Sequence, residues 1–383
     1  MSSVYAPAAM IPAAENQIKG KSTVGSRRAA LGEITNCPGT AAAAAVVTKK
    51  VQTRAGRAQK AKVQPIQVQA PAEPLPPVPE AEADVSMKEE EEQDLCRAFS
   101  AGLLPVEDVD KDDGDMPQLC AEYVKDIYRY LHQLEVQQPI HANYMEGYEI
   151  TALMRALLVD WMVQVHSSFQ LLQETLYLSV AVLDRFLQVQ PVSRRKLQLV
   201  GVTAMLVACK YEEMHAPEVG DFAYITDNAF SKAQILLMER LVLQALGFQL
   251  GRPLPLHFLR RASKVSNSDT ARHMLAKYLM ELTLIDYNMV HYRPSEVAAA
   301  ALCLAQLLLN GLPWSSTQQH YSTYDEAHLK PIMQHMAKNV VMVNEGKTKF
   351  QAVRNKYSSS KLLKISLIPQ LKSKLVCDMA AAL

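Results

Sequence analysis

Hydrophobic residues recur at helical spacing through the middle of the chain, which carries the most regular pattern of the whole sequence. The first stretch places apolar residues at the i, i+3, i+4 and i+7 positions that indicate an α-helix: Met154, Leu157, Leu158, Trp161 and Val165. Its other side is apolar too, as expected for a helix inside a helical domain. The pattern predicts five helices in this region, at Thr151–Phe169, Glu174–Val189, Ser193–Glu213, Glu218–Ile225 and Ser231–Gly247.

Two charged residues, Arg155 and Asp160, interrupt the first of these apolar helices. A charge buried alone in a protein interior is costly, so such a residue is rarely left without a partner. We therefore expect Arg155 to pair with a carboxylate. Asp184, in the second predicted helix, is the best candidate for a structural ion pair.

The later part of the chain repeats the helical pattern and shows no strand-like alternation. Helices are predicted near Leu254–Ser263, Asp269–Val290, Ser295–Asn310, Glu326–Asn344 and Thr348–Ser358. Tyr177–Phe186 and Tyr278–Tyr287 are faintly similar, which suggests an internal repeat. A further amphipathic helix is predicted from Tyr123 to Leu134. The predicted fold class is all-α, with two tandem five-helix domains at residues 116–249 and 250–383.

Residues 1–115 have a different composition, and Tyr5 and Phe99 are the only aromatic residues among them. A segment dominated by Ala, Pro, Gln, Lys and Glu cannot bury enough apolar surface to offset its ordering entropy, so we expect a disordered tail. Its charge is uneven. Residues 1–62 contain ten Lys and Arg residues and two acidic residues, whereas residues 63–115 contain three Lys and Arg residues and fifteen acidic residues. Asp108–Leu119 resembles a calcium loop only superficially, because its glycine and final residue are misplaced.

The sequence carries no recognisable catalytic motif, and we expect a protein that is not an enzyme. Gly346-Lys347-Thr348 lacks the upstream glycine of a phosphate-binding loop, and HExxH, GxSxG and the protein-kinase motifs are missing. The six cysteines show neither a CxxC pair nor metal-ligand spacing. No uninterrupted apolar run reaches ~18 residues. The net charge of +1 offers no general footprint for nucleic acid. We therefore expect no metal, cofactor, nucleic acid or membrane insertion.

Several motifs, in the same order along the chain, resemble the cyclin family. Met154–Trp161 resembles the signature of the first cyclin-box helix, and Lys210–Glu213 fits the same family. Gly251–Ala262 is similar to B-type mitotic cyclins in particular, and Lys356–Ile365 is closest to their second vertebrate subtype. The resemblance covers the chain from about Leu95 to its end. It implies two cyclin boxes in a regulatory subunit that activates a cyclin-dependent Ser/Thr kinase at the G2/M transition.

The resemblance implies a kinase-binding face on the first box. Lys210 and Glu239 would hydrogen-bond the kinase backbone beside its αC helix. An apolar pocket would receive an αC side chain and would consist of Val207, Tyr211, Leu243 and Leu250. On the residues alone, Lys210 and Glu239 could equally pair with solvent or with each other.

The resemblance also implies a groove that takes RxL-type peptides from kinase substrates and inhibitors. The groove would consist of Met154, Leu157, Leu158, Trp161 and Gln198. These side chains could all be core residues, but the first helix is apolar on more sides than one core needs, which favours an exposed patch. Gln164 stands where related S-phase cyclins carry a carboxylate, so attraction for the cation of the peptide is expected to be weaker.

Two segments of the tail resemble regulatory signals of the same family. The nine residues from Arg28 to Asn36 resemble a destruction box. Arg28 and Leu31 would be its main anchors, and Gly32, Ile34 and Asn36 would complete the motif. This implies binding by the anaphase-promoting ubiquitin ligase and ubiquitin-dependent proteolysis at mitotic exit. Residues 95–106 resemble a retention and export segment, which implies cytoplasmic localisation in interphase with access to the nucleus at mitosis.

Two other functions fit an all-α chain, namely a cyclin-fold transcription factor and a plain helical scaffold. The transcription factor would need a basic face on the helical domains and usually a zinc-binding N-terminus. The near-neutral charge and the scattered Cys and His residues argue against both features.

Overall fold

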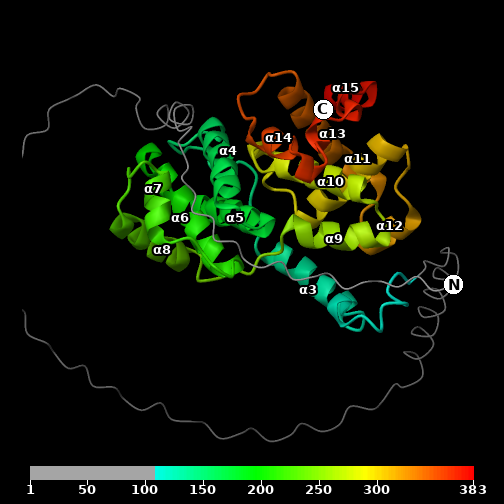
Figure 1. Cartoon of the computed structure of the whole chain (residues 1–383), viewed down its shortest axis with the longest axis horizontal. Helices are drawn as coiled ribbons and strands as arrows, with labels where there is room; N and C mark the ends of the chain where they lie inside the picture. The colour runs from blue at the N-terminus through cyan, green and yellow to red at the C-terminus, as the bar shows by residue number, and fades with distance from the viewer. Residues whose placement is uncertain (1–107) are drawn as a thin grey trace, which may run out of the picture. The chain divides into compact units, whose positions relative to one another are not determined.

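Helices account for every regular element of residues 108–383, the part of the chain that the computed structural model describes (Figure 1). Most of them form two bundles within one compact unit that includes Val109–Leu383. The first bundle confirms the five predicted helices to within two residues at each end. It consists of α4 (Ala152–Phe169), α5 (Gln173–Val189), α6 (Arg194–Glu212), α7 (Val219–Ile225) and α8 (Lys232–Ala245).

Local sequence sets the ends of these helices. The Thr151 side chain accepts a hydrogen bond from the backbone of Met154 and begins α4. Ser231 and Gln234 form a reciprocal capping box at the start of α8. Gly247 follows α8 with a φ of +57°, a left-handed conformation that favours glycine and ends the helix there.

The second bundle contains the five predicted helices and two that the sequence did not predict. The predicted ones are α9 (Pro255–Val265), α10 (Thr270–Thr283), α11 (Pro294–Asn310), α13 (Glu326–Asn344) and α14 (Ala352–Tyr357). The additional ones are the short α12 (Ser316–Ser322) and α15 (Lys374–Ala381), which packs against α13. The expected helix Asp269–Val290 is too long. Its final turn is a separate 3-10 segment, Tyr287–Met289, in which the Asp286 carboxylate accepts a hydrogen bond from the backbone amide of Asn288.

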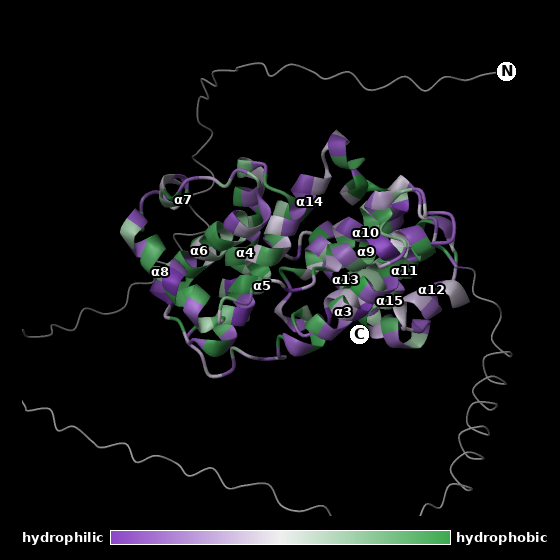
Figure 2. Ribbon diagram, turned by 90° about the horizontal axis from the view of Figure 1, so that it is seen from below, coloured by the Kyte–Doolittle hydropathy of each residue, from purple (hydrophilic) through white to green (hydrophobic). Residues whose placement is uncertain are grey.

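Helices α4 and α6 approach each other within the first core, where hydrophobic residues predominate on the ribbon (Figure 2). A Cβ atom added to Gly201 of α6 would lie 2.7 Å from Cδ1 of Leu158 of α4, so a side chain at this position would displace Leu158 from its place in the core. Leu158 is completely buried.

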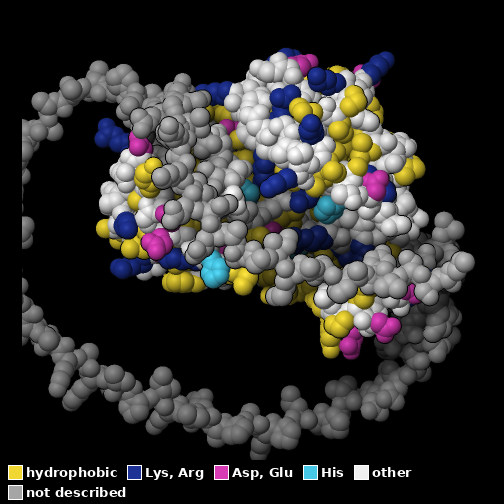
Figure 3. All heavy atoms as spheres, viewed as in Figure 1, with side chains coloured by type: hydrophobic (Ala, Val, Ile, Leu, Met, Phe, Trp, Pro, Cys, Tyr) yellow, Lys and Arg dark blue, Asp and Glu magenta, His cyan; other side chains and the backbone are white. Residues whose placement is uncertain are grey.

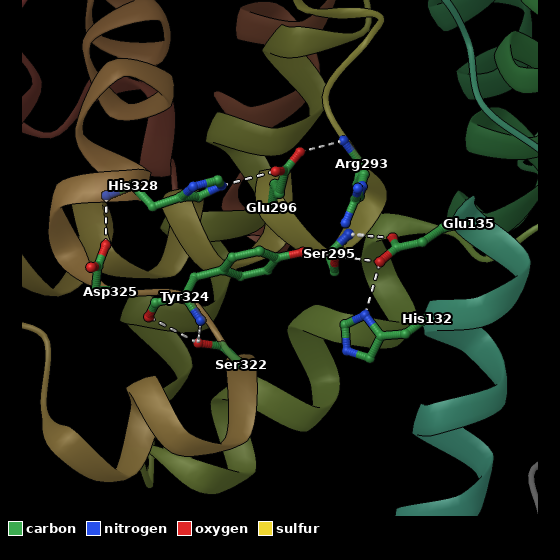
Figure 4. Close-up of polar contacts among 9 residues, drawn as sticks. All are labelled: His132, Glu135, Arg293, Ser295, Glu296, Ser322, Tyr324, Asp325 and His328. Atoms are coloured by element: carbon green, nitrogen blue, oxygen red, sulfur yellow. Dashed lines mark hydrogen bonds and ion pairs between the residues drawn. The ribbon is translucent and has the colours of Figure 1, made fainter.

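Helix α3 (Val124–Gln137) precedes the first bundle in sequence, yet it binds to the second. Figure 4 shows the contact at its C-terminal end, where the Glu135 carboxylate accepts hydrogen bonds from Ser295 N at 3.1 Å and Ser295 Oγ at 2.6 Å. Ser295 lies in the first turn of α11, where free backbone amides favour a carboxylate. His132 contacts the same carboxylate at 2.8 Å, and Tyr324 reaches the Ser295 hydroxyl at 2.7 Å.

The expected ion pair of Arg155 and Asp184 is confirmed, and it also joins the two bundles. The guanidinium donates to both Asp184 oxygens, with Nε–Oδ1 2.6 Å and Nη2–Oδ2 2.7 Å. Arg155 Nη1 also donates to the carbonyls of Leu284 and Ile285, at 2.9 and 3.4 Å, in the second bundle. Burial, the largest single effect, would lower the pKa of Arg155, but the charge and hydrogen bonds of Asp184, together with Tyr144, outweigh it and raise the pKa.

Two further polar contacts connect the bundles. Asp160, the second charge of α4, accepts a hydrogen bond at 2.9 Å from the backbone of Ala352, at the start of α14. Glu281 of α10 is fully buried and holds three donors from two other helices. These are Lys356 Nζ at 2.6 Å, the Tyr357 hydroxyl at 2.9 Å and Gln173 Nε2 at 3.0 Å.

The expected boundary of the tail at residue 115 is wrong. Asp110 and Asp113 are only 6% and 7% exposed, because both carboxylates contact cations of α9. The described chain therefore packs against the second bundle from about residue 109 onward.

Replacing Asp184 by Asn should destabilise the protein by about 3–5 kcal/mol, because the change keeps the shape but leaves the charge of Arg155 buried and uncompensated. Urea unfolding followed by circular dichroism measures the effect. Glu149→Gln is the matched control: it breaks an ion pair with Arg194 whose side chains are 43% and 54% exposed, and it should change stability by less than about 0.5 kcal/mol. Equal effects of the two substitutions would contradict the role given to the buried pair.

Candidate functional site

Lys210 and Glu239 share one face of the first bundle. Lys210 lies in the last turn of α6 and Glu239 lies in the middle of α8, and these two helices pack against each other. Lys210 Nζ donates to Glu239 Oε1 at 2.7 Å, with side-chain exposures of 48% and 13%. In the chain alone, Lys210 and Glu239 therefore pair with each other, which is one of the possibilities that the residues alone left open. Because the lysine end of this pair is open to solvent, the pair contributes little stability, and Lys210 can exchange its partner at low cost.

The apolar residues expected around this pair differ in how far they reach the surface. Tyr211 is 54% exposed, and Leu243 and Leu250 are half-buried. Val207 is only 3% exposed, so it can form at most the floor of a pocket. Tyr211 lies close to the backbone that links the two bundles. The Tyr211 hydroxyl oxygen is 3.3 Å from the position that a Cβ atom would occupy on Gly251.

Helix α8 exposes more apolar surface than the candidate set included. One side of it is buried in the core through Ile235, Met238 and Val242. The other side and the residues after it leave large apolar side chains 45–68% exposed: Leu236, Leu237, Leu241 and Phe248. Hydrophobic side chains also show along the edge of the molecule below α8 and α3 (Figure 3). The sequence of α8 places leucines on more sides of the helix than one core can cover. This excess of apolar residues is the signal that could have identified the exposed ones.

The residues of the motif Lys210-Tyr211-Glu212-Glu213 differ in role: some are exposed at the surface, and one holds the helices together. Lys210 and Tyr211 are exposed. Glu213 instead accepts hydrogen bonds from Leu172 N at 2.7 Å and Thr175 Oγ1 at 2.6 Å, at the start of α5. Its carboxylate therefore caps α5 and fixes the end of α6 that carries the lysine. Burial next to this motif raises the pKa of the Cys209 thiol to about 12, so this cysteine stays protonated.

The candidate docking groove on α4 is smaller than the sequence predicts. Leu158 has no exposed surface and is a core residue, so its assignment to the groove is wrong: it fills the space that Gly201 leaves open. Trp161 and Gln198 are 8% and 5% exposed and can offer only their edges. Met154 and Leu157 are half-buried and remain accessible. A docking role for this reduced surface stays a prediction.

Gln164, at the end of the candidate groove, has a partner within its own helix. Its Nε2 donates to Oδ2 of Asp160 at 3.1 Å. Burial raises the pKa of Asp160, and the hydrogen bonds from Ala352 and Gln164 oppose that effect by stabilising the carboxylate. Gln164 thus supports the contact between α4 and α14 and adds no negative charge to the groove.

Other sequence-based expectations concern features beyond this face. The destruction-box segment, residues 28–36, and the retention and export segment, residues 95–106, lie outside the described residues. Within residues 108–383 no group of three or more His, Cys, Asp and Glu side chains is arranged to hold a metal ion. In the same range no helix combines the length and apolar character needed to span a bilayer.

Comparisons with known proteins place this geometry in context. The family model described as "Cyclin, N-terminal domain" matches residues 126–251, and the model described as "Cyclin, C-terminal domain" matches residues 253–371. The chain is 68% identical over 386 residues to the G2/mitotic-specific cyclin-B2 of Oryzias latipes, covering 100% of this chain and 99% of that protein. It is 63% identical over 293 residues to the human protein of the same name, covering 76% and 74% of the two chains.

The fold is also similar to a solved structure of low sequence identity. The X-ray structure of a viral cyclin from herpesvirus saimiri superposes with a TM-score of 0.50 at 20% identity. The match covers 55% of this chain and 96% of the viral one. The likeness supports the helical architecture of the two bundles.

Replacing Lys210 by Ala should change the free energy of unfolding by less than about 1 kcal/mol, because the Lys210 side chain is about half exposed and its ion pair with Glu239 is open to water at that end. Chemical denaturation of the isolated protein measures this quantity. A loss of several kcal/mol would show that the pair is a structural element of the bundle rather than a surface available to a partner.

Proposed function

The chain belongs to the cyclin family, as a B-type mitotic cyclin, and from this premise we propose that it activates a cyclin-dependent Ser/Thr kinase at the G2/M transition. The two helical bundles are tandem cyclin boxes, so the predicted fold class is confirmed. Cyclins are regulatory subunits of cyclin-dependent kinases rather than enzymes, and the catalytic step belongs to the kinase. The observation that carries the proposal is the exposed Lys210–Glu239 pair within the apolar surface of α6 and α8.

This surface has the composition of a protein interface. Exposed apolar side chains surround one pair of opposite charges, and burying them against a kinase would supply most of the driving force. Lys210 Nζ can donate to a backbone carbonyl of the kinase, and the Glu239 carboxylate can accept from a backbone amide. Each group thereby exchanges its present partner for one on the kinase, so neither charge is left unpaired when water is excluded.

Activation follows from differential stabilisation of two kinase conformations. A cyclin that binds the inward position of the kinase αC helix more tightly than the outward position shifts the population inward. The inward position completes the Lys–Glu ion pair of the kinase and allows its activation loop to order. Tyr211, Leu243 and Leu250 form the rim of the surface that would receive an αC side chain, with Val207 beneath them.

The accessible part of the α4 groove suits weak docking of substrate peptides. Met154 and Leu157 can contact an apolar peptide residue, and the edges of Trp161 and Gln198 can add contacts. Because Gln164 is neutral and bonded to Asp160, the groove offers little attraction for an arginine of an RxL motif. We therefore expect apolar peptide residues to determine docking more strongly than cations do.

The N-terminal tail would limit the lifetime of the protein. The nine residues from Arg28 to Asn36 match a destruction box, which supports binding by the anaphase-promoting ubiquitin ligase at mitotic exit. The lysines Lys19, Lys21, Lys49 and Lys50 stand nearby as ubiquitin acceptors. The apolar residues within 95–106 support retention in the cytoplasm during interphase, with access to the nucleus at mitosis.

Exchanging the two charges, as Lys210→Glu with Glu239→Lys, should abolish co-purification of the kinase. The exchanged residues can still pair with each other, so circular dichroism and the unfolding midpoint should stay unchanged. The face, however, would present an acceptor where a donor is needed. Affinity for the kinase should fall at least about tenfold, as expected when interfacial charges lose their partners. A pull-down from mitotic extract with a histone-kinase assay measures binding and activation.

The matched control exchanges another exposed pair of the same type, as Glu345→Lys with Lys347→Glu, in the second box. These side chains lie 2.5 Å apart and are 46% and 61% exposed. The control should bind and activate the kinase normally. Undiminished binding by the Lys210–Glu239 exchange would refute the interface assignment.

Replacing Arg28 and Leu31 by Ala should lengthen the half-life of the protein at mitotic exit, because both anchors of the destruction box would be lost. Cycloheximide chase in synchronised cells measures the half-life. The matched control replaces Val51 and Arg54 by Ala, an apolar and a basic residue at the same separation in the same tail. Equal half-lives for the Arg28 and Leu31 variant and the parent chain would remove the destruction-box assignment.

A further inference from the structure

Two acidic residues before α3 bind a pair of cations on α9. The Asp110 carboxylate contacts Arg261 through both oxygens, with Nη1–Oδ1 2.5 Å and Nη2–Oδ2 2.6 Å. Lys264 Nζ donates to Asp110 Oδ1 at 2.9 Å and also to the Asp113 carboxylate. Arg261 and Lys264 stand three residues apart and so lie on the same side of α9. The four side chains form a neutral cluster in which each charge has an opposite partner.

Aromatic side chains from two other helices enclose the arginine of this cluster. The Arg261 guanidinium carbon lies 5.6 Å from the ring centre of Tyr128 of α3 and 5.2 Å from that of Tyr321 of α12. The Tyr128 hydroxyl donates to the carbonyl of His257 at 2.9 Å, which fixes its ring against α9. The Tyr321 hydroxyl accepts a hydrogen bond at 3.2 Å from the backbone of Val109. The site is therefore assembled from α3, α9 and α12 together.

The acidic segment is folded to present both carboxylates to this site. Asp113 N donates to the carbonyl of Asp110 at 3.2 Å, and Met116 N donates to the carbonyl of Asp113 at 2.9 Å. These turns direct both carboxylates toward α9, where they are almost completely buried. A bidentate arginine–carboxylate pair with a second cation is the strong form of such a contact.

The Asp110 carboxylate of this contact stays ionised at physiological pH. The hydrogen bond from Arg261, opposed by burial and supported by Lys264, lowers the pKa of Asp110 to about 2. Arg261 and Lys264 thus both keep the Asp110 carboxylate ionised. Competition from another anion, rather than acidification, is what could open the contact.

We propose that Arg261 and Lys264 form a receptor for an acidic peptide segment, and that residues 109–113 of the same chain occupy it as an intramolecular latch. The latch braces the start of α3, whose other end is held by Glu135 and Ser295. The exposed apolar side chains of α3, Tyr123, Ile127 and Tyr130, are thereby presented in one orientation. The latch does not depend on the kinase-binding proposal.

Hydrogen–deuterium exchange of the full-length chain tests the latch. Reversing both cations, as Arg261→Glu with Lys264→Glu, should accelerate amide exchange in residues 109–123 on the order of tenfold, because the acidic segment is then repelled. Adding Asp110→Lys and Asp113→Lys to that variant restores opposite charges and should restore protection. Lys347→Glu, an exposed charge reversal elsewhere in the second box, is the matched control and should leave these amides unchanged.

A milder variant covers the case in which charge reversal on α9 impairs folding. Asp110→Asn with Asp113→Asn leaves α9 untouched and should still accelerate exchange in residues 109–123. Unchanged exchange in this variant, with helical content intact by circular dichroism, would overturn the proposal. Failure of the fourfold charge exchange to restore protection in a folded protein would overturn it as well.

Discussion

One buried guanidinium connects the two boxes, and the way in which the second box packs against the first depends on it. Arg155 uses two of its nitrogens for Asp184 of its own bundle and a third for carbonyls at the end of α10 in the other bundle. Tyr144 adds a hydrogen bond to Asp184 at 2.8 Å from the segment before α4. If the second bundle turned relative to the first, the Arg155–Asp184 pair would remain, but Nη1 of the buried guanidinium would lose its carbonyl acceptors, which is costly in a protein interior.

The outward faces follow from how the chain distributes apolar residues around this fixed centre. Helix α8 buries one side and exposes the other, so the Lys210–Glu239 pair stands in an apolar surface that the bundle itself does not use. Helix α3 shows the same division. It reaches the second box through Tyr128 and Glu135 and leaves other aromatic side chains exposed. Rigid packing within and between the bundles therefore supports surfaces that remain available to a partner.

The sequence predicts most of what depends on local pattern. Periodic apolar spacing located the ten main helices, and the cost of a lone charge in an apolar helix identified the Arg155–Asp184 pair. Features that depend on a distant segment were missed or misjudged. Leu158 is core because Gly201, on another helix, leaves room for it. Asp110 is ordered because Arg261, 151 positions later, receives it. Helix α12 consists almost entirely of polar residues, Ser-Thr-Gln-Gln-His-Tyr-Ser, so apolar spacing cannot reveal it.

The central claim is that the kinase binds the face around Lys210 and Glu239, and a crystal structure of the complex tests it most directly. The account predicts that Lys210 Nζ and the Glu239 carboxylate have left each other and lie within about 3.5 Å of backbone atoms of the kinase, beside its αC helix. Tyr211, Leu243 and Leu250 should be covered by an αC side chain. A complex in which the kinase occupies another face, with the 2.7 Å pair still intact and exposed, would contradict the account.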